Sequence, residues 1–562
     1  MKYKLIGEND FTFGLTQQIG KNRGVENIDA LLSVSEKDCF SPFKLENMQQ
    51  AVGMLKKHQH KNSKVHIIVD ADCDGACSAT IMYLYLKKCG FSNVTWNNHP
   101  KKIHGIFFEE LKSFEFDLLI VPDAGSSDYE QIEILSSRGV DVLVIDHHEA
   151  PKYSEHAVTI NPKMCDYPNK EMCGAGVVYK VCEAFDLAEM TNYAPEFLDL
   201  VALGTIADMM DTRIPETRYF CTEGLKKVKN KMFKSIIDKQ KFKMGDDLTI
   251  IGVQFYIAPL INSVFRSGTK EELDKMFTGF ITTELVEVDY QKRGAGLVKV
   301  LLQEDIAREI GNIKVRQDKN KGKLMGPILD IARNQSEDKI HILDVSNVED
   351  PEMLGLIAND VAKRQQRPAL ILRKAKDGLL RGSARNYGKF EIDNLKSFLM
   401  PFSFESLQGH ENAFGVSLKA ENLDSVREEI KLATRDISVE ETFYIDFIVS
   451  PKDLTKKFIR EIDKMKPLWG NSFEEAYILV KGVTCSDAQI NEKRTMLSWT
   501  DKNLKYVIFN PTEKQIEDLL DKSLECDIIG RVGTNEWNGT TTEQVVISDL
   551  EVKEMKEKEI WF

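Results

Sequence analysis

The sequence of 562 residues contains ten cysteines but no Cys-x-x-Cys pair. This absence argues against a zinc knuckle or a redox-active dithiol, and we interpret the cysteines as reduced, mostly buried thiols. No uninterrupted apolar run is long enough to cross a bilayer, and the first residues lack the apolar core of a signal peptide. We therefore expect a cytoplasmic protein that is not associated with a membrane.

Positive charge is also in short supply, with 75 lysines and arginines against 88 aspartates and glutamates and a formal net charge of −13. This balance excludes a chain that binds nucleic acid along its whole surface. Basic residues nevertheless gather in four stretches, at 314–323, 364–367, 373–374 and 381–385. Because local fields rather than net charge govern binding, a nucleic-acid partner stays compatible with the sequence.

Several catalytic signatures are missing as well. The sequence has no Gly-x-x-x-x-Gly-Lys-Ser/Thr loop, which argues against a P-loop nucleotide hydrolase, and no Gly-x-Ser-x-Gly elbow of a serine hydrolase. The run Asp72-x-Asp74-Gly75 is similar to the start of an EF-hand loop, but the closing glutamate of that loop is absent.

Acidic residues, in contrast, are concentrated in four short segments of the first 210 residues. The segments are Asp70-Ala-Asp72-Cys-Asp74-Gly75, Val121-Pro-Asp123-Ala-Gly125, Asp146-His147-His148 and Gly204-Thr-Ile-Ala-Asp208. The first three end apolar runs that predict strands at 65–69, 117–121 and 140–145, and helical patterns lie between them, the first at 76–88. This alternation predicts a parallel sheet, whose carboxyl edge would bring the acids together.

Such a cluster favours divalent cations, because neighbouring carboxylates repel one another unless cations lie among them. In a strand, the spacing of Asp70, Asp72 and Asp74 would place all three on one face, and Gly75 would then open the helix. Carboxylates with one or two imidazoles suit Mn²⁺ or Mg²⁺. Two such ions about 3.5–4 Å apart can activate a water and stabilise a leaving oxygen, so the pattern predicts phosphoester hydrolysis.

The rest of the chain divides by its patterns. We expect residues 1–60 to be helical, helices at 174–185 and 195–207, a long charged helix over 285–315 and a loop at 319–323. A second α/β segment follows, with strands at 339–344, 369–373 and 379–385 and a helix at 352–365. Short β-like runs from about residue 435 onward predict a small barrel.

The four acidic segments resemble motifs I to IV of the DHH phosphoesterase superfamily. Three further segments resemble RecJ-type single-strand exonucleases: Asn161-Pro162, Cys173-Gly-Ala-Gly-Val177, and Ala258-Pro-Leu-Ile-Asn262 with Arg266-Ser-Gly268. Gly355-Leu-Ile-Ala358, Arg381-Gly-Ser-Ala-Arg385 and Gly409-His410 resemble the DHHA1 domain, and 535–539 resembles a turn of the family's OB domain. The resemblance extends over nearly the whole chain.

The fold that this resemblance implies is α/β. It comprises an N-terminal helical segment, a parallel-sheet DHH domain, a long connecting helix, a smaller α/β DHHA1 domain and a C-terminal β-barrel of the OB type. The expected boundaries are 1–60, 61–280, 281–325, 326–432 and 433–562, respectively.

The resemblance also implies roles for individual residues. Asp72, Asp74, Asp123, His147 and Asp208 would bind two Mn²⁺ or Mg²⁺ ions, with Asp123 between them, and Asp70 matches the motif as a further ligand. His148 would contact the scissile phosphate or protonate the leaving oxygen, and Asn262 and Arg266 would hold that phosphate. Substrate binding would involve Ser383 and Arg385, as the pocket for the 5′ phosphate, together with Arg381, His410 and Lys101.

Lys101 departs from the family pattern, which has an arginine at this position. Lysine offers a point charge without the guanidinium fork, so the phosphate would be held less tightly there.

The activity implied is removal of mononucleotides from the 5′ end of single-stranded DNA, in repair, recombination or replication. Single-stranded DNA would be the partner, with a helicase and a single-strand-binding protein as possible associates of a monomeric enzyme. One alternative is a phosphodiesterase of the same superfamily that acts on short oligonucleotides or cyclic dinucleotides, against which the third domain argues. Another is a non-catalytic binding module, against which the intact set of metal ligands argues.

Overall fold

The computed structural model describes residues 1–12, 14–99, 103–245, 247–292, 294–347, 353–439, 441–470, 472–520, 523–537 and 540–553. The chain forms two compact units. The unit with the acidic segments comprises 29–317 and 467–474, and the other comprises 1–28, 318–466 and 475–562. Each unit is described by itself.

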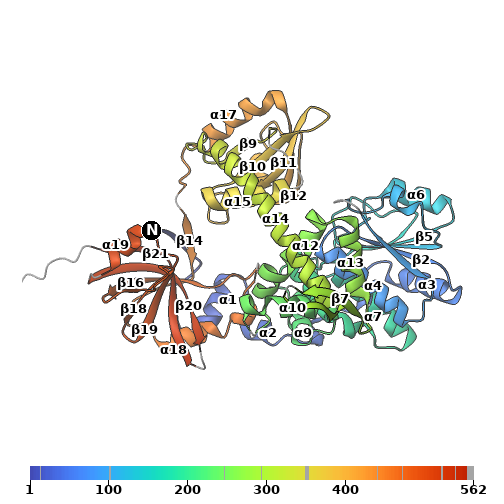
Figure 1. Cartoon of the computed structure of the whole chain (residues 1–562), viewed down its shortest axis with the longest axis horizontal. Coiled ribbons are helices and arrows are strands. Elements are labelled where there is room, and N and C mark those ends of the chain that lie inside the picture. The colour runs from blue at the N-terminus through green and yellow to red at the C-terminus, as the bar shows by residue number, and fades with distance from the viewer. Residues whose placement is uncertain are drawn as a thin grey trace, which may run out of the picture. The chain divides into compact units, whose positions relative to one another are not determined.

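The first of these units is built on a five-stranded parallel sheet with the order β3-β2-β4-β5-β6 (Figure 1). The strands are β2 (Val65–Val69), β3 (Val94–Asn98), β4 (Leu118–Pro122), β5 (Asp141–Ile145) and β6 (Val158–Ile160). The three strands that the apolar runs predict are confirmed within one residue at each end. The parallel sheet is confirmed as well.

Both faces of this sheet are buried, as a parallel sheet requires. The helices next to it are α3 (Met48–His60), α4 (Cys73–Lys88), α5 (Phe108–Leu111), α6 (Tyr129–Ser137) and α7 (Gly174–Glu189). Ile68, Leu119 and Val144 pack with α5 and α6 on one face. Ile67, Ile120 and neighbours on the other face pack with α3, α4 and α7. The strands read as continuous apolar runs because both faces are covered.

His66 is a polar exception inside this core. It is fully buried in β2, with Nδ1 2.8 Å from Thr95 Oγ1 and Nε2 2.9 Å from Asn97 Oδ1. Its ring stacks on Phe116, with 5.3 Å between the ring centroids. Burial lowers the pKa of His66 to about 4, although the hydrogen bond with Asn97 opposes the shift. The folded protein therefore keeps this imidazole neutral at pH values where an unfolded chain would protonate it.

We expect the free energy of unfolding to fall by about 1–2 kcal/mol between pH 7 and pH 5 because of His66. The unfolded chain binds the additional proton below its pKa of 6.5, whereas the folded state resists protonation down to about 4. Stability is thus lost as the pH falls through this window. Urea unfolding at the two pH values measures the change, and a His66→Gln variant should lose this part of it. An unchanged pH dependence in that variant would contradict the assignment.

The remaining helices of the unit pack beyond α4 and α7. They are α8 (Leu198–Ala207), α9 (Pro215–Lys226), α10 (Lys231–Met244), α11 (Ile250–Gly252), α12 (Ala258–Ser267) and α13 (Lys270–Ile281). A π-helical turn, Val253–Ile257, joins α11 to α12. The helices predicted at 174–185 and 195–207 are confirmed, the second beginning as a 3-10 turn at Ala194–Phe197.

The expected helix over 285–315 is wrong in its first half. Residues 287–301 form the antiparallel hairpin β7 (Glu287–Lys292) and β8 (Gly296–Leu301), and α14 (Leu302–Arg333) follows. The apolar and polar residues of 287–301 alternate, and Gly294 and Gly296, both with positive φ, form the turn. The loop expected at 319–323 is also wrong, since these residues lie inside α14.

The expectation that residues 1–60 are helical needs one correction. Lys2–Leu5 form strand β1, which pairs in parallel with β14 (Thr442–Ile445). Four residues are too few for a periodic pattern, and the strand depends on a partner 440 residues further along the chain. Helices follow at α1 (Leu15–Asn22), α2 (Ile28–Leu32) and α3.

The second unit contains a smaller α/β sheet with the order β12-β13-β11-β10-β9. Its strands are β9 (His341–Asp344), β10 (Ala369–Lys374), β11 (Leu379–Arg385), β12 (Ser406–His410) and β13 (Ala413–Lys419), with helices α15 (Leu354–Gln365), α16 (Leu395–Leu399) and α17 (Leu423–Ala433). The three predicted strands are confirmed, the first starting two residues later than expected, and so is the helix between the first two, of which residue 352 lies outside the described residues. β12 and β13 were not predicted.

The same unit ends in a seven-stranded mixed sheet with the order β15-β16-β20-β21-β19-β18-β17. The strands are β15 (Phe447–Val449), β16 (Tyr477–Cys485), β17 (Gln489–Ile490), β18 (Met496–Asp501), β19 (Leu504–Phe509), β20 (Leu524–Trp537) and β21 (Thr540–Lys553), with helices α18 (Lys456–Asp463) and α19 (Glu513–Leu519). The predicted β-rich C-terminal part is confirmed. In the described part of the chain, no helix is both long and apolar enough to cross a membrane.

Candidate active site

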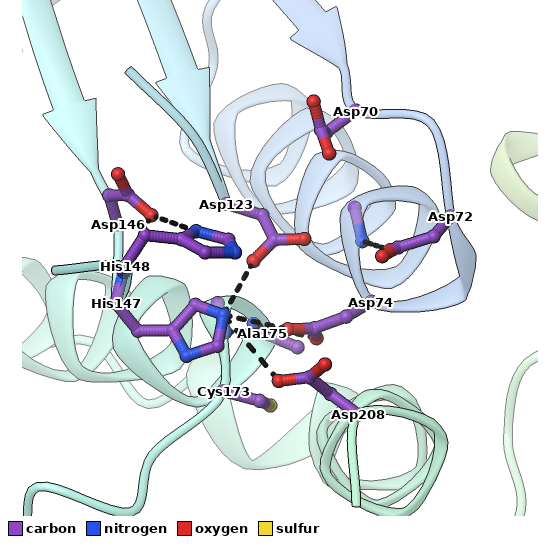
Figure 2. Close-up of polar contacts among 12 residues, drawn as sticks. Asp70, Asp72, Asp74, Asp123, Asp146, His147, His148, Cys173, Ala175 and Asp208 are labelled. Atoms are coloured by element: carbon purple, nitrogen blue, oxygen red, sulfur yellow. Dashed lines mark hydrogen bonds and ion pairs between the residues drawn. The ribbon is translucent and has the colours of Figure 1, made fainter. Parts of the chain in front are cut away.

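The acidic segments meet at the carboxyl edge of the first sheet, as predicted. Asp70 directly follows β2, Asp123 follows β4 and Asp146 follows β5. Figure 2 shows their side chains around one pocket, together with Asp74 from α4 and Asp208 from the end of α8. These segments are up to about 140 residues apart in sequence; the parallel topology gathers the three strand ends, and the packing of α4 and α8 adds Asp74 and Asp208.

The first segment reaches this pocket differently from the prediction of a strand with three aspartates on one face. Asp72 is the N-cap of α4, and its Oδ1 accepts a hydrogen bond of 2.9 Å from the Gly75 amide. Asp74 therefore lies in the first helical turn. The cap explains the early start of the helix, because it satisfies an amide that would otherwise lack a partner.

Asp74 is held by the N-terminus of another helix. Its two carboxylate oxygens accept hydrogen bonds of 2.6 Å from the Gly174 amide and 3.1 Å from the Ala175 amide at the start of α7. The close approach also depends on Gly204 of α8, where a Cβ would lie 2.3 Å from Asp74 Oδ1. Glycine in the Gly204–Asp208 segment thus makes room for the carboxylate.

Asp123 adopts a backbone conformation that non-glycine residues rarely occupy. Its φ is 67°, and its amide donates a hydrogen bond of 2.7 Å to the carbonyl of Ile145. A Cβ at Gly174 would lie 2.3 Å from Asp123 Oδ1, so this glycine leaves space for the side chain. Backbone strain of this kind is typical of functional sites. Here it turns the carboxylate of Asp123 into the pocket.

His147 lies between the carboxylates. Its Nε2 is 3.2 Å from Asp123 Oδ1, 3.6 Å from Asp208 Oδ2 and 4.0 Å from Asp74 Oδ2 (Figure 2). The imidazole and three carboxylates from four separate segments thus converge on one small volume.

Electrostatic repulsion in this volume is strong. The pKa of Asp74 is raised to about 6, first by burial and then by the charge of Asp72. Burial followed by the charge of Asp74 raises the pKa of both Asp123 and Asp208 well above the usual range. The pKa of Asp72 is raised by burial and by Asp70. Without a cation, the site disfavours the carboxylate form of all four groups.

The residues fit divalent cations in both number and chemistry. Three sets have ligand atoms within 4.8 Å of one another: Asp74, His147 and Asp208; Asp70, Asp72 and Asp123; and Asp123, His147 and His148. In the described part of the chain, the buried oxygens Asp123 Oδ1 and Asp208 Oδ2 accept no hydrogen bond of acceptable geometry. Buried carboxylate oxygens of this kind are rare unless a ligand satisfies them.

Asp146 differs from the other acids, because its carboxylate is hydrogen-bonded to the two histidines that follow it. Its Oδ1 accepts hydrogen bonds from the amides of His147, at 2.7 Å, and His148, at 3.1 Å, and lies 2.8 Å from His148 Nδ1. Burial would raise its pKa, but the hydrogen bond and charge of His148 outweigh burial and hold the pKa below its usual range. The same contact raises the pKa of His148 to about 9. Asp146 therefore orients the two histidines.

His104 is a residue that the sequence did not single out as part of the site. Its Nδ1 lies 2.6 Å from Asp70 Oδ2, and the Gly105 amide donates to Asp70 Oδ1 at 3.2 Å. The hydrogen bond with Asp70 raises the pKa of His104 against the effect of burial. The only signal in the sequence was the resemblance of this segment to the family, because His104 follows no predicted strand. Both oxygens of Asp70 are engaged by these contacts.

Asn262 and Arg266 reach the first acidic segment from α12. Asn262 Oδ1 accepts a hydrogen bond of 3.0 Å from the Cys73 amide, between Asp72 and Asp74. Burial lowers the pKa of Arg266, and the charge of Asp72 opposes the shift, so this guanidinium lies within electrostatic reach of Asp72. The structure thus brings both residues to the site.

The predicted phosphate-binding residues of the second unit also lie together. Arg381, Ser383 and Arg385 alternate along β11 and therefore share a face, away from buried Leu380 and Ala384. His410 lies in the same row of the sheet as Arg385, with Ala413 between them. Lys101 lies outside the described residues.

Gly355, in the first turn of α15, lies next to Ser383 and Arg385. A Cβ there would lie 2.9 Å from Arg385 Nη2 and 3.5 Å from Ser383 Oγ. A helix N-terminus beside an arginine and a hydroxyl is a suitable place for an anion.

A parallel sheet with clustered carboxylates and imidazole at its carboxyl edge defines an α/β protein of the DHH phosphoesterase class. Residues 64–205 match the family model described as DHH family, N-terminal domain, and residues 445–549 match the RecJ OB domain.

The chain is 36% identical, over the whole of both chains, to YorK of Bacillus subtilis (strain 168), which bears the name of an SPbeta prophage-derived single-strand DNA-specific exonuclease. The present chain therefore belongs to the RecJ family of the DHH superfamily. RecJ of B. subtilis (strain 168) is 26% identical over 98% of this chain and 70% of that protein. The crystal structure of RecJ from Thermus thermophilus in complex with Mn²⁺ has a TM-score of 0.74 and 19% identity, covering 96% of this chain and 76% of that one, and shares its fold.

Proposed function

We propose that this protein is a metal-dependent exonuclease that hydrolyses single-stranded DNA from its 5′ end to mononucleotides. The observation that carries the proposal is the convergence of Asp74, Asp123 and Asp208 on His147 Nε2, within 4.0 Å in each case. The relatives named as single-strand DNA-specific exonucleases supply the substrate class.

Two Mn²⁺ or Mg²⁺ ions would be held by the sets described above. Asp74, His147 and Asp208 would hold one ion, and Asp72 and Asp123, with Asp70 beside them, would hold the other. Asp123 lies next to both sets through its contact with His147, which makes it the natural bridge. When bound, the ions would polarise the phosphodiester and favour deprotonation of an attacking water.

The residues around the acids would position the substrate. Arg266 and Asn262 approach the pocket from α12 and would hold the scissile phosphate. The contact with Asp146 raises the pKa of His148 to about 9, which favours its protonated form at neutral pH, and the Nδ1 of His148 faces Asp146. Its Nε2 is then the nitrogen that would donate a proton to the leaving oxygen.

The cellular setting is part of the same proposal. A role in DNA repair, recombination or replication, cooperation with a helicase and a single-strand-binding protein, and a monomeric state all follow from the resemblance to the RecJ family. Size-exclusion chromatography with light scattering tests the monomeric state directly.

Digestion of a single-stranded oligonucleotide with a label at one end tests the activity. With Mn²⁺, a 5′ label should be released as a mononucleotide from the first turnover, whereas a 3′-labelled strand should shorten step by step. A duplex of the same sequence should resist digestion. Equal cutting of the duplex, or no release of mononucleotides, would contradict the proposal. Faster turnover of dinucleotides than of long strands would favour the short-oligonucleotide alternative.

Arg385 should control the preference for a 5′ phosphate. We expect Arg385→Ala to raise KM for a 5′-phosphorylated strand by about 10–100-fold, because a charge-assisted contact with a phosphate contributes about 1.5–3 kcal/mol. KM for a 5′-hydroxyl strand should change little. Arg381 shares a face of β11 with Arg385 but pairs with Asp377, so Arg381→Ala is a matched control with a smaller effect. Equal losses on both strands would contradict the assigned role.

A further inference from the structure

Two adjacent aromatic residues, Phe255 and Tyr256, are exposed in the π-helical turn that precedes α12, the helix of Asn262 and Arg266. Their exposed fractions are 59% and 37%. Among the described residues, neither ring stacks on another aromatic ring or on a cation. Side chains of this size normally contribute to a core. Phe255 and Tyr256 precede Asn262 by seven and six residues, so a ligand bound at the candidate active site is the contact to test for them.

The burial pattern of this helix leaves one open face. Ile257, Ala258, Leu260, Ile261, Ser263, Val264 and Phe265 are all buried. The residues between 254 and 267 that are not buried are Gln254, Phe255, Tyr256, Pro259, Asn262, Arg266 and Ser267, and Pro259, Asn262 and Arg266 among them follow helical spacing. Within α12, Pro259, Asn262 and Arg266 therefore share a face, and the aromatic pair lies in the π-helical turn that precedes it.

A π-helical turn sets the direction of the pair. Pro259 lacks an amide hydrogen, and its ring would clash with the carbonyl of residue 255 in a regular α-helix. The π turn Val253–Ile257, immediately before α12, accommodates this proline. Turns of this kind occur often at functional sites, because they redirect side chains without ending the helix.

Asn262 fixes the far end of this face. Its Oδ1 accepts a hydrogen bond of 3.0 Å from the Cys73 amide, inside the first acidic segment. Six residues of helix from Tyr256 to Asn262 amount to ~9 Å, which is the length of two to three stacked nucleotides. The aromatic pair is thus within reach of bases close to a phosphate held at Asn262.

We propose that Phe255 and Tyr256 form a stacking platform for the bases that adjoin the scissile phosphate. The inference rests on the proposed function, since it takes single-stranded DNA as the substrate. Bases stack on exposed aromatic rings without regard to sequence, and only unpaired bases can do so. The platform would therefore contribute to the preference for single strands, in addition to holding the strand.

Kinetics on strands with and without bases test the platform. The full-length protein with Mn²⁺ is given a 5′-phosphorylated strand and a strand of the same length made of abasic residues. Phe255→Ala and Tyr256→Ala should each raise KM for the base-bearing strand roughly tenfold, with little change in kcat. KM for the abasic strand should stay at its wild-type value. Phe255→Tyr should preserve the wild-type KM, whereas Phe255→Leu should not.

Phe43 offers a matched control. It is 42% exposed and belongs to the same unit, in the 3-10 turn Pro42–Lys44, which packs against α3 and α7. Phe43→Ala should leave both KM values unchanged. Equal losses on both strands, or a lowered thermal midpoint with an unchanged ratio of the two KM values, would overturn the inference and assign the pair a structural role.

The failure of this inference is distinguishable from that of the proposed function. If the wild-type protein cuts the strand and the aromatic variants match it, the platform is refuted and the nuclease stands. If the wild-type protein cuts nothing, the proposed function fails. Binding of the same two strands, measured by fluorescence anisotropy, then tests whether the aromatic pair stacks on bases. Equal affinity of the wild-type protein and the alanine variants for the base-bearing strand would then refute it.

Discussion

Replacing Asp123 with asparagine is expected to reduce the rate of strand hydrolysis by about 1000-fold or more, equivalent to ~4 kcal/mol. Asp123 contacts His147 Nε2 at 3.2 Å and belongs to two of the three possible ligand sets. Asparagine keeps the shape of the side chain and tolerates the φ of 67°. The loss would therefore report the missing charge. Steady-state kinetics with Mn²⁺ at saturating strand measure it.

The same substitution should make the metal-free protein more stable. Burial and neighbouring acids raise the pKa of Asp123, so its ionised form is unfavourable in the folded state. Removing the charge relieves this repulsion. Glu133→Gln, at an exposed position in α6, is the matched control and should alter neither activity nor stability. Wild-type activity in the Asp123 variant would refute the assigned role.

Replacing Glu216 with glutamine is expected to destabilise the protein by about 3–5 kcal/mol. Lys180 Nζ lies 3.0 Å from Glu216 Oε1, and both side chains are fully buried. Glu216 also accepts hydrogen bonds of 3.0 Å from the Phe40 amide and from the Tyr167 hydroxyl. Glutamine would leave the buried ammonium of Lys180 with the partly exposed carboxylate of Glu183, at 3.0 Å, as its remaining counter-charge. Urea unfolding followed by circular dichroism measures the loss.

Two further variants identify the cause of this loss. Lys180→Met combined with Glu216→Gln removes both charges, keeps an acceptor oxygen for the Phe40 amide and the Tyr167 hydroxyl, and should recover part of the stability. Glu115→Gln breaks an exposed pair with Lys64 and should leave the unfolding midpoint unchanged. If Glu216→Gln unfolds at the wild-type urea concentration, the pair does not carry the buried charge that the structure assigns to it.

Much of the site could be predicted because each acid follows a local pattern. An apolar run that ends in aspartate identifies a buried strand and its carboxyl end, as at Asp70, Asp123 and Asp146. Parallel topology then places these ends at one edge. The family resemblance added Asn262 and Arg266. Their helix is distant in sequence from the first acidic segment, which it contacts through Asn262.

What could not be predicted depends on contacts between distant residues. The early start of α4 follows from the cap between Asp72 and Gly75, which competes with a strand of the same spacing. The hydrogen bond between His104 and Asp70 joins residues 34 positions apart, and no periodic pattern in the sequence predicts it. The hairpin at 287–301 was missed because its many charged residues resemble an exposed helix, although its alternation is that of strands.

The most direct test of the metal centre is anomalous diffraction at the manganese absorption edge, from crystals grown with Mn²⁺. The account predicts one peak among Asp74, His147 and Asp208 and a second beside Asp72 and Asp123. An empty pocket in those maps, or manganese bound only elsewhere on the protein, would contradict it.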